Sequence, residues 1–185
     1  MKKILFFDTE TTGVDLDDRI MQFGAIVWSY DEEDGKWYEE RRINQYINPE
    51  KEPNKEAQKV HGITLEFTQK FNTMDKYIKE FIAYMNQCEY IVWHNVEYDW
   101  RMLQQDLKRF WLQFNKDDRL CTMKLGTDIC QLPWWFNWWF KRPKLVQLHE
   151  KLFNKWFDGA HDAMADITAT KDCFLEMIKL WIVQI

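Results

Sequence analysis

The amino-terminal part of the chain alternates short apolar runs with polar turns. Residues 4–7 are all apolar and are followed at once by polar side chains, which predicts a short strand buried on both faces. Residues 20–28 predict a second strand, and residues 36–47 predict a third with one wet face. Because the connections are short, we expect an antiparallel meander that is ended by Pro49 and Pro53.

Farther along the chain, the apolar positions change to helical spacing. A short helix is predicted over residues 54–60, and Thr73 is expected to cap a longer one. The apolar residues of that longer helix recur at helical spacing and are Tyr77, Ile78, Phe81, Ile82 and Met85.

In the second half of the chain, strands and helices alternate. Residues 90–93 predict a buried strand, residues 96–110 a helix, and residues 120–123 a short fifth strand. An amphipathic helix is expected after Pro143, and a final helix over residues 162–183. Strands first, followed by strand–helix alternation, predict an α/β domain with a mixed sheet.

Composition limits the class of protein. The 185 residues are most economically one domain, residues 1–185, and 46% hydrophobic with 30% charged residues describes a soluble globule rather than a disordered chain. The formal net charge of −5 excludes a strongly basic protein that coats nucleic acid. It does not exclude nucleic acid as a substrate, because carboxylates that hold metal ions count in this sum while the ions do not.

The cysteines and the apolar runs indicate the compartment. The four cysteines form no C-x-x-C pair, which argues against a zinc cluster or a disulfide framework and suits a reducing compartment. The apolar run at residues 4–7 is too short for a signal peptide, and no run approaches membrane-spanning length. We therefore expect a cytoplasmic protein with no membrane partner.

Asp8 and Glu10 follow the first predicted strand directly. Side chains two apart in an extended chain project to the same side, so both carboxylates lie at the carboxyl end of a core strand, where α/β folds place ligands. Two like charges this close need an opposite charge, and a hard divalent metal ion is the simplest candidate. The alternative is a strand that runs into an acidic turn, with Gly13 as the bend.

Two later segments carry residues of the same kind. Residues 94–99, with the sequence HNVEYD, place Asp99 in an early turn of a helix that follows a buried strand. Residues 161–170 place Asp166 on the final helix, with His161 just ahead of it. Taken singly, each has an ordinary explanation, since acidic residues favour helix N-termini and His161 could belong to a helix cap.

In this order and at these spacings, the three segments resemble the DEDDh family of 3′–5′ exonucleases. The family pattern is D-x-E near the amino terminus, H-N-x-x-[FY]-D in mid-chain and H-x-A-x-x-D towards the carboxyl end, and the chain matches all three. A sister group has Tyr where residue 162 is Asp, so His161, five residues before Asp166, indicates the DEDDh subclass. Residues 60–64 and 120–125 also resemble segments of such proteins, among them the proofreading subunit of the bacterial replicative polymerase, and ribonuclease T is similar too.

The resemblance implies a fold and a mechanism. The fold would be a ribonuclease H-like, five-stranded mixed sheet flanked by helices, with two Mg²⁺ or Mn²⁺ ions in the active site. Asp8 would bridge the ions, Glu10 and Asp166 would complete the site of the nucleophile, and Asp99 would hold the second ion. His161 would accept the proton of the attacking water, which suits an imidazole with an unperturbed pKa of roughly 6.5.

Positions near the motifs give the expected contacts with the terminal nucleotide. These residues are Thr11, Thr12, Gly13, His61 and Tyr98. The first three would contribute backbone groups, and the two rings would pack on sugar or base. For Tyr98 a place in the core is an equal alternative, since aromatic residues usually serve burial.

Residues 134–140 form an unusual aromatic segment, which lies between the second and third motifs. It holds six aromatic side chains in seven residues and is followed by Lys141, Arg142 and Lys144. One hypothesis is a stacking platform for single-stranded nucleic acid, with the cations on phosphates. The alternatives are packing on the core and a subunit interface.

The sequence thus predicts release of nucleoside 5′-monophosphates from the 3′ ends of single-stranded or frayed DNA or RNA. An RNA-trimming exoribonuclease is the alternative within the family. A non-catalytic nucleic-acid-binding or interaction module is disfavoured, because all five functional residues are present. A polymerase or a second copy of the chain could be a partner. Since the chain ends soon after its last predicted helix, we expect no polymerase-binding tail.

Overall fold

Five strands form one sheet, with β1 at its centre. The computed structural model describes residues 2–133 and 140–185. The strands are β1 (Lys2–Thr11), β2 (Ile20–Asp31), β3 (Lys36–Tyr46), β4 (Tyr90–Trp93) and β5 (Arg119–Cys121). Their order is β3-β2-β1-β4-β5, in which β1, β2 and β3 pair antiparallel while β4 and β5 run parallel to β1. The predicted five-stranded mixed sheet is confirmed.

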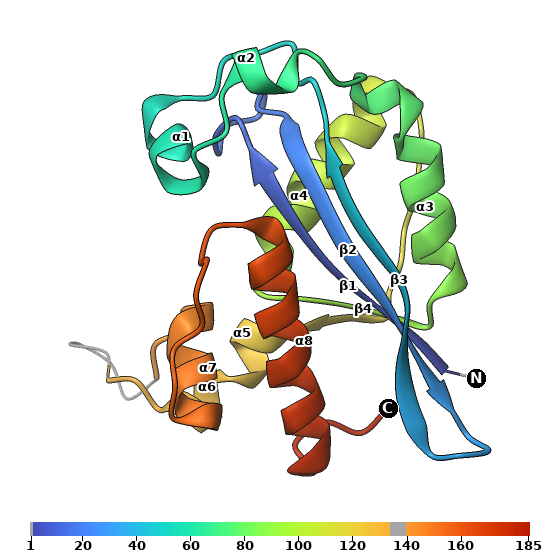
Figure 1. Cartoon of the computed structure of the whole chain (residues 1–185), viewed down its shortest axis with the longest axis vertical. Helices are drawn as coiled ribbons and strands as arrows, with labels where there is room; N and C mark the ends of the chain where they lie inside the picture. The colour runs from blue at the N-terminus through green and yellow to red at the C-terminus, as the bar shows by residue number, and fades with distance from the viewer. Residues whose placement is uncertain (1, 134–139) are drawn as a thin grey trace.

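Helices cover both faces of this sheet (Figure 1). They are α1 (Lys55–His61), α2 (Leu65–Thr68), the 3₁₀ turn η1 (Met74–Lys76), α3 (Ile78–Gln87), α4 (Val96–Arg109), α5 (Thr122–Leu125), α6 (Thr127–Cys130), α7 (Leu145–Phe153) and α8 (Ala163–Lys179). The helices α3 and α4 pack on one face of the sheet, and α8 packs on the other. Every helix of the described ranges is too short or too polar to cross a membrane.

Alternation along β1 divides the core between these two layers. Leu5 and Phe7 point into the cluster that contains α3 and α4. Ile4 and Phe6 point to the opposite face, where the rings of Phe6 and Phe174 of α8 have centroids 5.8 Å apart. The run of buried side chains from residue 4 to residue 7 therefore serves both faces of a central strand, as its continuous apolar character predicts.

The same strand continues into the polar residues that follow. β1 extends to Thr11, beyond its predicted end at Phe7, because it pairs with β2 as far as Ile20. Asp8 and Glu10 therefore lie within the strand and share the face of α8, whereas Thr9 lies on the face of α4. The predicted turn begins only after the two carboxylates.

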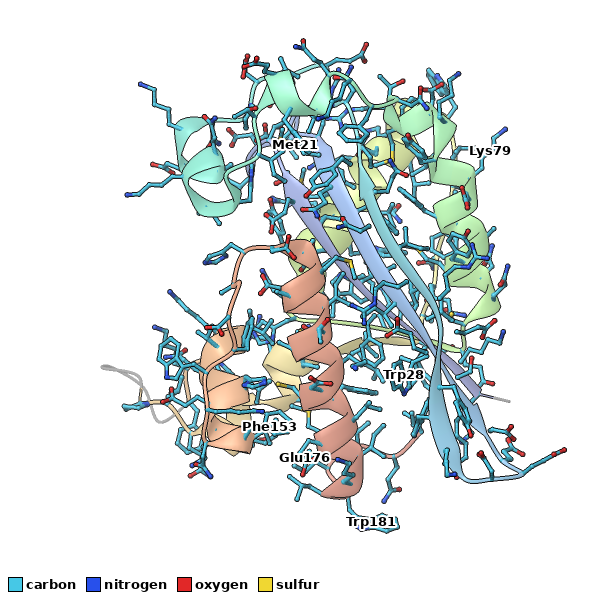
Figure 2. The ribbon with its side chains drawn as sticks, viewed as in Figure 1. Met21, Trp28, Lys79, Phe153, Glu176 and Trp181 are labelled. Atoms are coloured by element: carbon cyan, nitrogen blue, oxygen red, sulfur yellow. The ribbon has the colours of Figure 1, made fainter. Side chains whose placement is uncertain are left out.

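Several boundaries differ from those predicted. The final helix ends at Lys179, and the nearby Trp181 is 81% exposed (Figure 2). Residues 122–125 form α5 instead of continuing the fifth strand. Thr73 makes no capping hydrogen bond, because its hydroxyl donates to the carboxylate of Asp75, and η1 separates it from α3. The pattern does not predict α2 and α6, which are only four residues long.

Of the aromatic segment, only its last residue, Phe140, belongs to the described part of the chain. Residues 134–139 lie outside the described part of the chain. On either side of them, the backbone N–H of Lys141 donates to the carbonyl oxygen of Leu132 at 2.8 Å. The stacking and packing hypotheses for the segment therefore stay predictions.

Candidate active site

The end of β1 and the start of α8 bring three carboxylates together. Asp8 and Glu10 project from one face of β1, and Asp166 lies in the first turn of α8. One carboxylate oxygen from each residue lies within 4.8 Å of the other two. Side chains from opposite ends of the sequence therefore meet at one point.

The helix α8 comes this close to β1 because of a glycine in the neighbouring strand. Gly24 of β2 pairs with Asp8 in register. A Cβ atom on Gly24 would lie 2.4 Å from Cδ1 of Ile167 and 3.3 Å from the Cβ of Ala163. Both of these α8 residues are fully buried against the sheet. A side chain at position 24 would have to displace the end of the Ile167 side chain and would press on Ala163, and both residues belong to the helix that carries Asp166.

Asp99 reaches the site from the other face of the sheet. The chain turns from β4 into α4 through Asn95, whose φ of 74° is left-handed, and Asp99 follows in the first turns of the helix. Its Oδ1 accepts hydrogen bonds from the Thr9 hydroxyl (2.6 Å) and the Thr9 backbone N–H (3.2 Å). Asp99 is only 3% exposed. Because both groups donate to Oδ1, the Oδ2 atom can bind a further ligand.

Burial raises the pKa of every carboxylate in this group, and repulsion from neighbouring acids adds to the rise. Burial is the largest cause at each residue. Together with neighbouring carboxylates it raises the pKa of Glu10 to about 8, and it raises the pKa of Asp166 to about 6 although the hydrogen bond from the His161 backbone opposes the rise. The pKa of Asp99 rises to about 7, although the Thr9 hydrogen bonds oppose the rise. The pKa of Asp8 is raised by burial and then by the neighbouring carboxylates, first that of Asp99. Such a group needs a cation when it is ionised.

The donor set fits a divalent metal ion. Mg²⁺ and Mn²⁺ prefer oxygen ligands, and carboxylates supply both the oxygen atoms and the charge. Within residues 2–133 and 140–185, no lysine or arginine forms an ion pair with Asp8, Glu10 or Asp166. The negative charge at this point therefore has no lysine or arginine counter-ion among the described residues.

His161 lies just before α8 in an unusual backbone conformation. Its φ of 72° is in the left-handed region, which costs free energy in a residue other than glycine. Its backbone N–H donates to Oδ2 of Asp166 at 3.1 Å, so the carboxylate that joins the cluster also fixes the backbone of His161. The His161 side chain is exposed and lines the same cleft as the carboxylates. A water or substrate in the cleft can reach the imidazole.

A cleft of about 560 Å³ surrounds this group of side chains. Its lining includes all five predicted catalytic residues, which are Asp8, Glu10, Asp99, His161 and Asp166. The remaining lining comes mainly from the turn after β4, the start of α7 and the loop between α7 and α8. The structure thus brings the five residues to one cleft, while the role of each stays a prediction.

Some of the predicted substrate-binding residues line the cleft and others lie beside it. Tyr98 lines the cleft, and its hydroxyl donates to the carbonyl oxygen of Gly13 at 3.0 Å beside the Thr11 hydroxyl. His61 accepts a backbone N–H at Nδ1, so its Nε2 carries the proton and donates to the Thr11 carbonyl at 3.0 Å. Thr11, Thr12 and Gly13 are buried and do not line the cleft among the described residues. These residues form a hydrogen-bonded frame beside the cleft, and their contact with substrate stays a prediction.

Two residues of the site were not singled out from the sequence although a signal was present. Thr9 stands between Asp8 and Glu10, so strand alternation alone places it on the opposite face, towards the helix that carries Asp99. Gly24 stands inside an apolar strand, where glycine often marks the close approach of another element. Both residues position carboxylates.

Comparison with known proteins gives sequence relatives of one kind. The model of the exonuclease family (RNase_T) matches residues 5–174. The DNA polymerase III subunit epsilon of Buchnera aphidicola is 27% identical over 138 residues, which are 69% of this chain and 57% of that protein. Its counterpart in Rickettsia conorii is 32% identical over 105 residues, or 56% and 43% of the two chains. The chain spans about half the length of the curated relatives it matches.

Solved structures of similar fold are also nucleases. The nuclease domain of 3′hExo, a DEDDh family member bound to rAMP, gives a TM-score of 0.74 at 17% identity and covers 96% of this chain and 92% of that one. Escherichia coli exonuclease I in complex with a dT13 oligonucleotide gives 0.67 at 23% identity, over 98% of this chain and 43% of that one. These likenesses confirm the predicted ribonuclease H-like fold.

Proposed function

We propose that this chain, which belongs to the exonuclease family, removes nucleotides from the 3′ end of single-stranded or frayed nucleic acid and releases nucleoside 5′-monophosphates. The observation that carries the proposal is the meeting of Asp8, Glu10 and Asp166 within 4.8 Å. They share a cleft with Asp99 and His161, so every functional position of the DEDDh pattern opens on the same space.

The carboxylates are the proposed ligands of two Mg²⁺ or Mn²⁺ ions. When bound, two divalent ions lower the pKa of an attacking water and neutralise the charge that develops on the leaving oxygen. Asp8 would be shared between them, Glu10 and Asp166 would complete one site, and Asp99 would serve the other. The raised pKa values support this assignment, because a group of acids that is costly to ionise alone is stabilised by bound cations.

His161 is the proposed general base. Its imidazole is exposed in the cleft, and the bond from its backbone N–H to Asp166 holds it beside the carboxylates. Histidine is the side chain that most often serves as a general base in enzymes. In the proposed reaction His161 accepts the proton of the attacking water, the water oxygen bonds to phosphorus, and the 3′ oxygen of the preceding nucleotide leaves and is protonated by solvent.

The kind of nucleic acid is a separate part of the proposal. One fold relative was solved with a DNA oligonucleotide and another with the ribonucleotide rAMP, so both sugars occur on this fold. We take single-stranded DNA as the first substrate and RNA as the alternative, which would make the chain an exoribonuclease. The names of its sequence relatives add a polymerase as a candidate partner, and a homodimer is the other candidate assembly.

End-labelled oligonucleotides test this function directly. With Mg²⁺, a 3′ label should leave at once as a nucleoside 5′-monophosphate, while a 5′ label should give a ladder of shortened strands. EDTA should stop both reactions. A parallel series with RNA measures the preference between sugars. Release of the 5′ label first, internal cleavage, or undiminished activity in EDTA would contradict the proposal.

A pair of acid-to-amide variants controls this experiment. Asp8→Asn removes a proposed metal ligand and should abolish the ladder. Asp158→Asn changes an exposed acid in the loop before α8 that does not line the cleft, and it should leave the ladder unchanged. Equal activity in the two variants would count against the site.

A further inference from the structure

The cleft has a second wall, which the proposed chemistry does not use. Beside the carboxylates it is lined by Lys144 and Val146 at the start of α7 and by Trp156 in the loop after α7. We call these three residues the indole wall. Trp156 is 66% exposed. A ring of this size in solvent forgoes much of the free energy that its burial would give, so a bound partner would gain by covering it.

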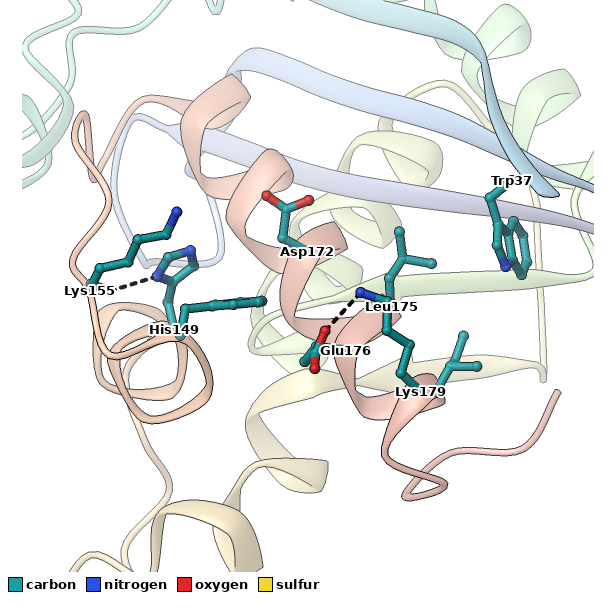
Figure 3. Close-up of a pocket in the computed structure, with 9 residues that line it drawn as sticks. Trp37, His149, Lys155, Asp172, Leu175, Glu176 and Lys179 are labelled. Carbon is teal, nitrogen blue, oxygen red and sulfur yellow. Dashed lines mark hydrogen bonds and ion pairs between the residues drawn. The ribbon is translucent and has the colours of Figure 1, made fainter.

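Trp156 is held in place by its neighbours in the loop. The buried His149 of α7 donates from Nδ1 to the carbonyl oxygen of Lys155 at 3.0 Å (Figure 3). The His149 ring also packs on Phe157, with centroids 5.2 Å apart. The residues on either side of Trp156 are thereby fixed to α7, while its own ring stays exposed at the cleft. Because the neighbouring residues are already fixed, a ligand that stacks on Trp156 has to order only its side chain.

Lys144 is anchored in a similar way. Nε2 of His94 lies 3.1 Å from the carbonyl oxygen of Pro143 and donates to it. The backbone N–H of Lys144 donates to Oε1 of Gln147 at 2.9 Å. The Lys144 side chain is exposed and forms no ion pair within the described chain, and residues 134–139 contain no acid that could pair with it. Its ammonium group is available to a ligand.

The neighbouring cations share one carboxylate and do not line the cleft. Lys124 and Arg142 both pair with Glu97, at 2.7 Å and 3.3 Å. Among the described residues that line the cleft, Lys144 is the one lysine or arginine. The wall therefore offers one aromatic face and one cation, which are the groups that bind a base and a phosphate of a single strand.

The position of this wall relative to the carboxylates selects the part of the strand that it can bind. A strand whose last phosphodiester lies at the carboxylates has its terminal nucleotide on one side of them and its remaining nucleotides on the other. The expected terminal-nucleotide contacts, Thr11 and His61, lie towards α1. In Figure 1, α1 lies above the start of α8, which carries Asp166, and α7 lies below it. The rest of the strand therefore leaves over α7.

We propose that the indole wall binds the substrate strand upstream of its terminal nucleotide, with Trp156 stacked on a base and Lys144 on a phosphate. The inference rests on the proposed function, because it needs the last phosphodiester at the carboxylates. Stacking on an indole is tolerant of base identity, so the wall holds any single strand and does not select a sequence.

A substrate with no upstream nucleotide isolates this contact. Thymidine 5′-(p-nitrophenyl phosphate) carries a single nucleoside, so it can occupy the terminal pocket, and it offers the indole wall only its nitrophenyl leaving group, with no upstream base or phosphate. Trp156→Ala should lower the ratio of kcat/KM for a single-stranded oligonucleotide to that for the ester about tenfold, mainly through KM. Trp156→Phe should recover part of the loss. The matched control, Trp111→Ala, removes a ring that is 95% exposed and outside the cleft lining, and should keep the wild-type ratio.

Salt dependence tests the lysine. Lys144→Ala should reduce the slope of log KM for the oligonucleotide against log salt concentration by about 0.7, the value for one phosphate contact with a single strand. Lys151→Ala removes an exposed lysine of the same helix that does not line the cleft, and should leave the slope unchanged.

The outcomes separate this inference from the proposed function. An unchanged ratio in Trp156→Ala, or an equal loss with oligonucleotide and ester, would overturn the inference while exonuclease activity stands. A wild-type protein that cleaves neither substrate in Mg²⁺ would remove the proposed function, and the inference with it.

Discussion

The carboxylate group and the indole wall line the same cleft, but they are held by different parts of the fold. Asp8 and Glu10 stand on the central strand, and Asp166 stands on a helix packed against that strand. Lys144 and Trp156 stand outside the sheet, and single side-chain hydrogen bonds from His94 and His149 hold the backbone next to them. The first group depends on packing of the whole domain, and the second on local anchors.

The difference also concerns charge. The carboxylates repel one another and have raised pKa values, so their arrangement is unfavourable until cations are bound. Among the described residues of the indole wall, no like charges repel one another. Its only unfavourable feature is an apolar ring that is exposed to water. We therefore expect changes at the carboxylates to alter metal binding and turnover, and changes at the indole wall to alter strand binding alone.

The largest effect is expected from Asp8→Asn. The variant removes the carboxylate that the proposed ions share, so several kcal/mol of transition-state charge stabilisation is lost and kcat/KM should fall by about a thousandfold. Calorimetric titration with Mn²⁺ should show weaker binding than in wild type, while circular dichroism shows an unchanged fold. Unaltered Mn²⁺ affinity would contradict the bridging role.

His161→Ala should give the next largest effect. It should separate proton transfer, which the variant loses, from metal binding, which it keeps. Removing a general base costs on the order of a hundredfold to ten-thousandfold in turnover. Mn²⁺ binding should stay close to that of wild type, because the Asp166 carboxylate accepts the backbone N–H of residue 161 and does not need the imidazole. A hydrolysis rate equal to wild type across pH would show that His161 is not the base.

Gly24→Ala should loosen the packing that the carboxylate group requires. The new methyl group would overlap Ile167, and overpacking of this kind costs about 1–3 kcal/mol in the free energy of unfolding. Ile167→Ala alone leaves a cavity, but the two substitutions together should be less destabilising than their sum, because the smaller side chain makes room for the methyl group. Thermal unfolding and nuclease assays of the two single variants and the double variant measure this coupling. Additive losses would mean that α8 does not rest on Gly24.

The sequence alone predicts most of the carboxylate side and little of the indole wall. Strand alternation places Asp8 and Glu10 together, and the three motifs name Asp99, His161 and Asp166 as their companions. Each of these inferences uses either the alternation of side chains along a strand or the spacing of residues in the family motifs. The central strand and its neighbours were predicted for the same reason, since apolar runs report burial directly.

The remaining features depend on contacts between segments that have no periodic pattern. Nothing in the spacing around Trp156 indicates that His149 binds the carbonyl oxygen before it. Likewise, Thr73 is a residue type that often caps helices. Its hydroxyl instead donates to the nearby carboxylate of Asp75, and α3 begins only after η1. Side-chain hydrogen bonds of this sort leave no periodic signal in the sequence, so the site was predictable as a set of ligands and not as a shaped cleft.

The smallest expected effect is the pH dependence of folding stability in the absence of metal. It tests whether repulsion among the ionised carboxylates destabilises the fold. Burial raises the folded-state pKa of Glu10 to about 8, so its contribution to stability is complete below the unfolded pKa of about 4.3 and is lost as the pH rises through 8. In EDTA, the melting temperature of wild type should therefore fall between pH 6.5 and 8.5. Burial lowers the pKa of His94 to about 4, so His94 makes stability rise with pH, but only below this window. Each kcal/mol lost corresponds to about 2–4 °C. Asp166→Asn should show a smaller fall because the largest neighbouring charge that acts on Glu10 is gone, and Mn²⁺ should remove most of the fall in wild type. If the two proteins lost stability equally in EDTA, the carboxylates would not be coupled, and the contrast between the two walls of the cleft would lose its electrostatic basis.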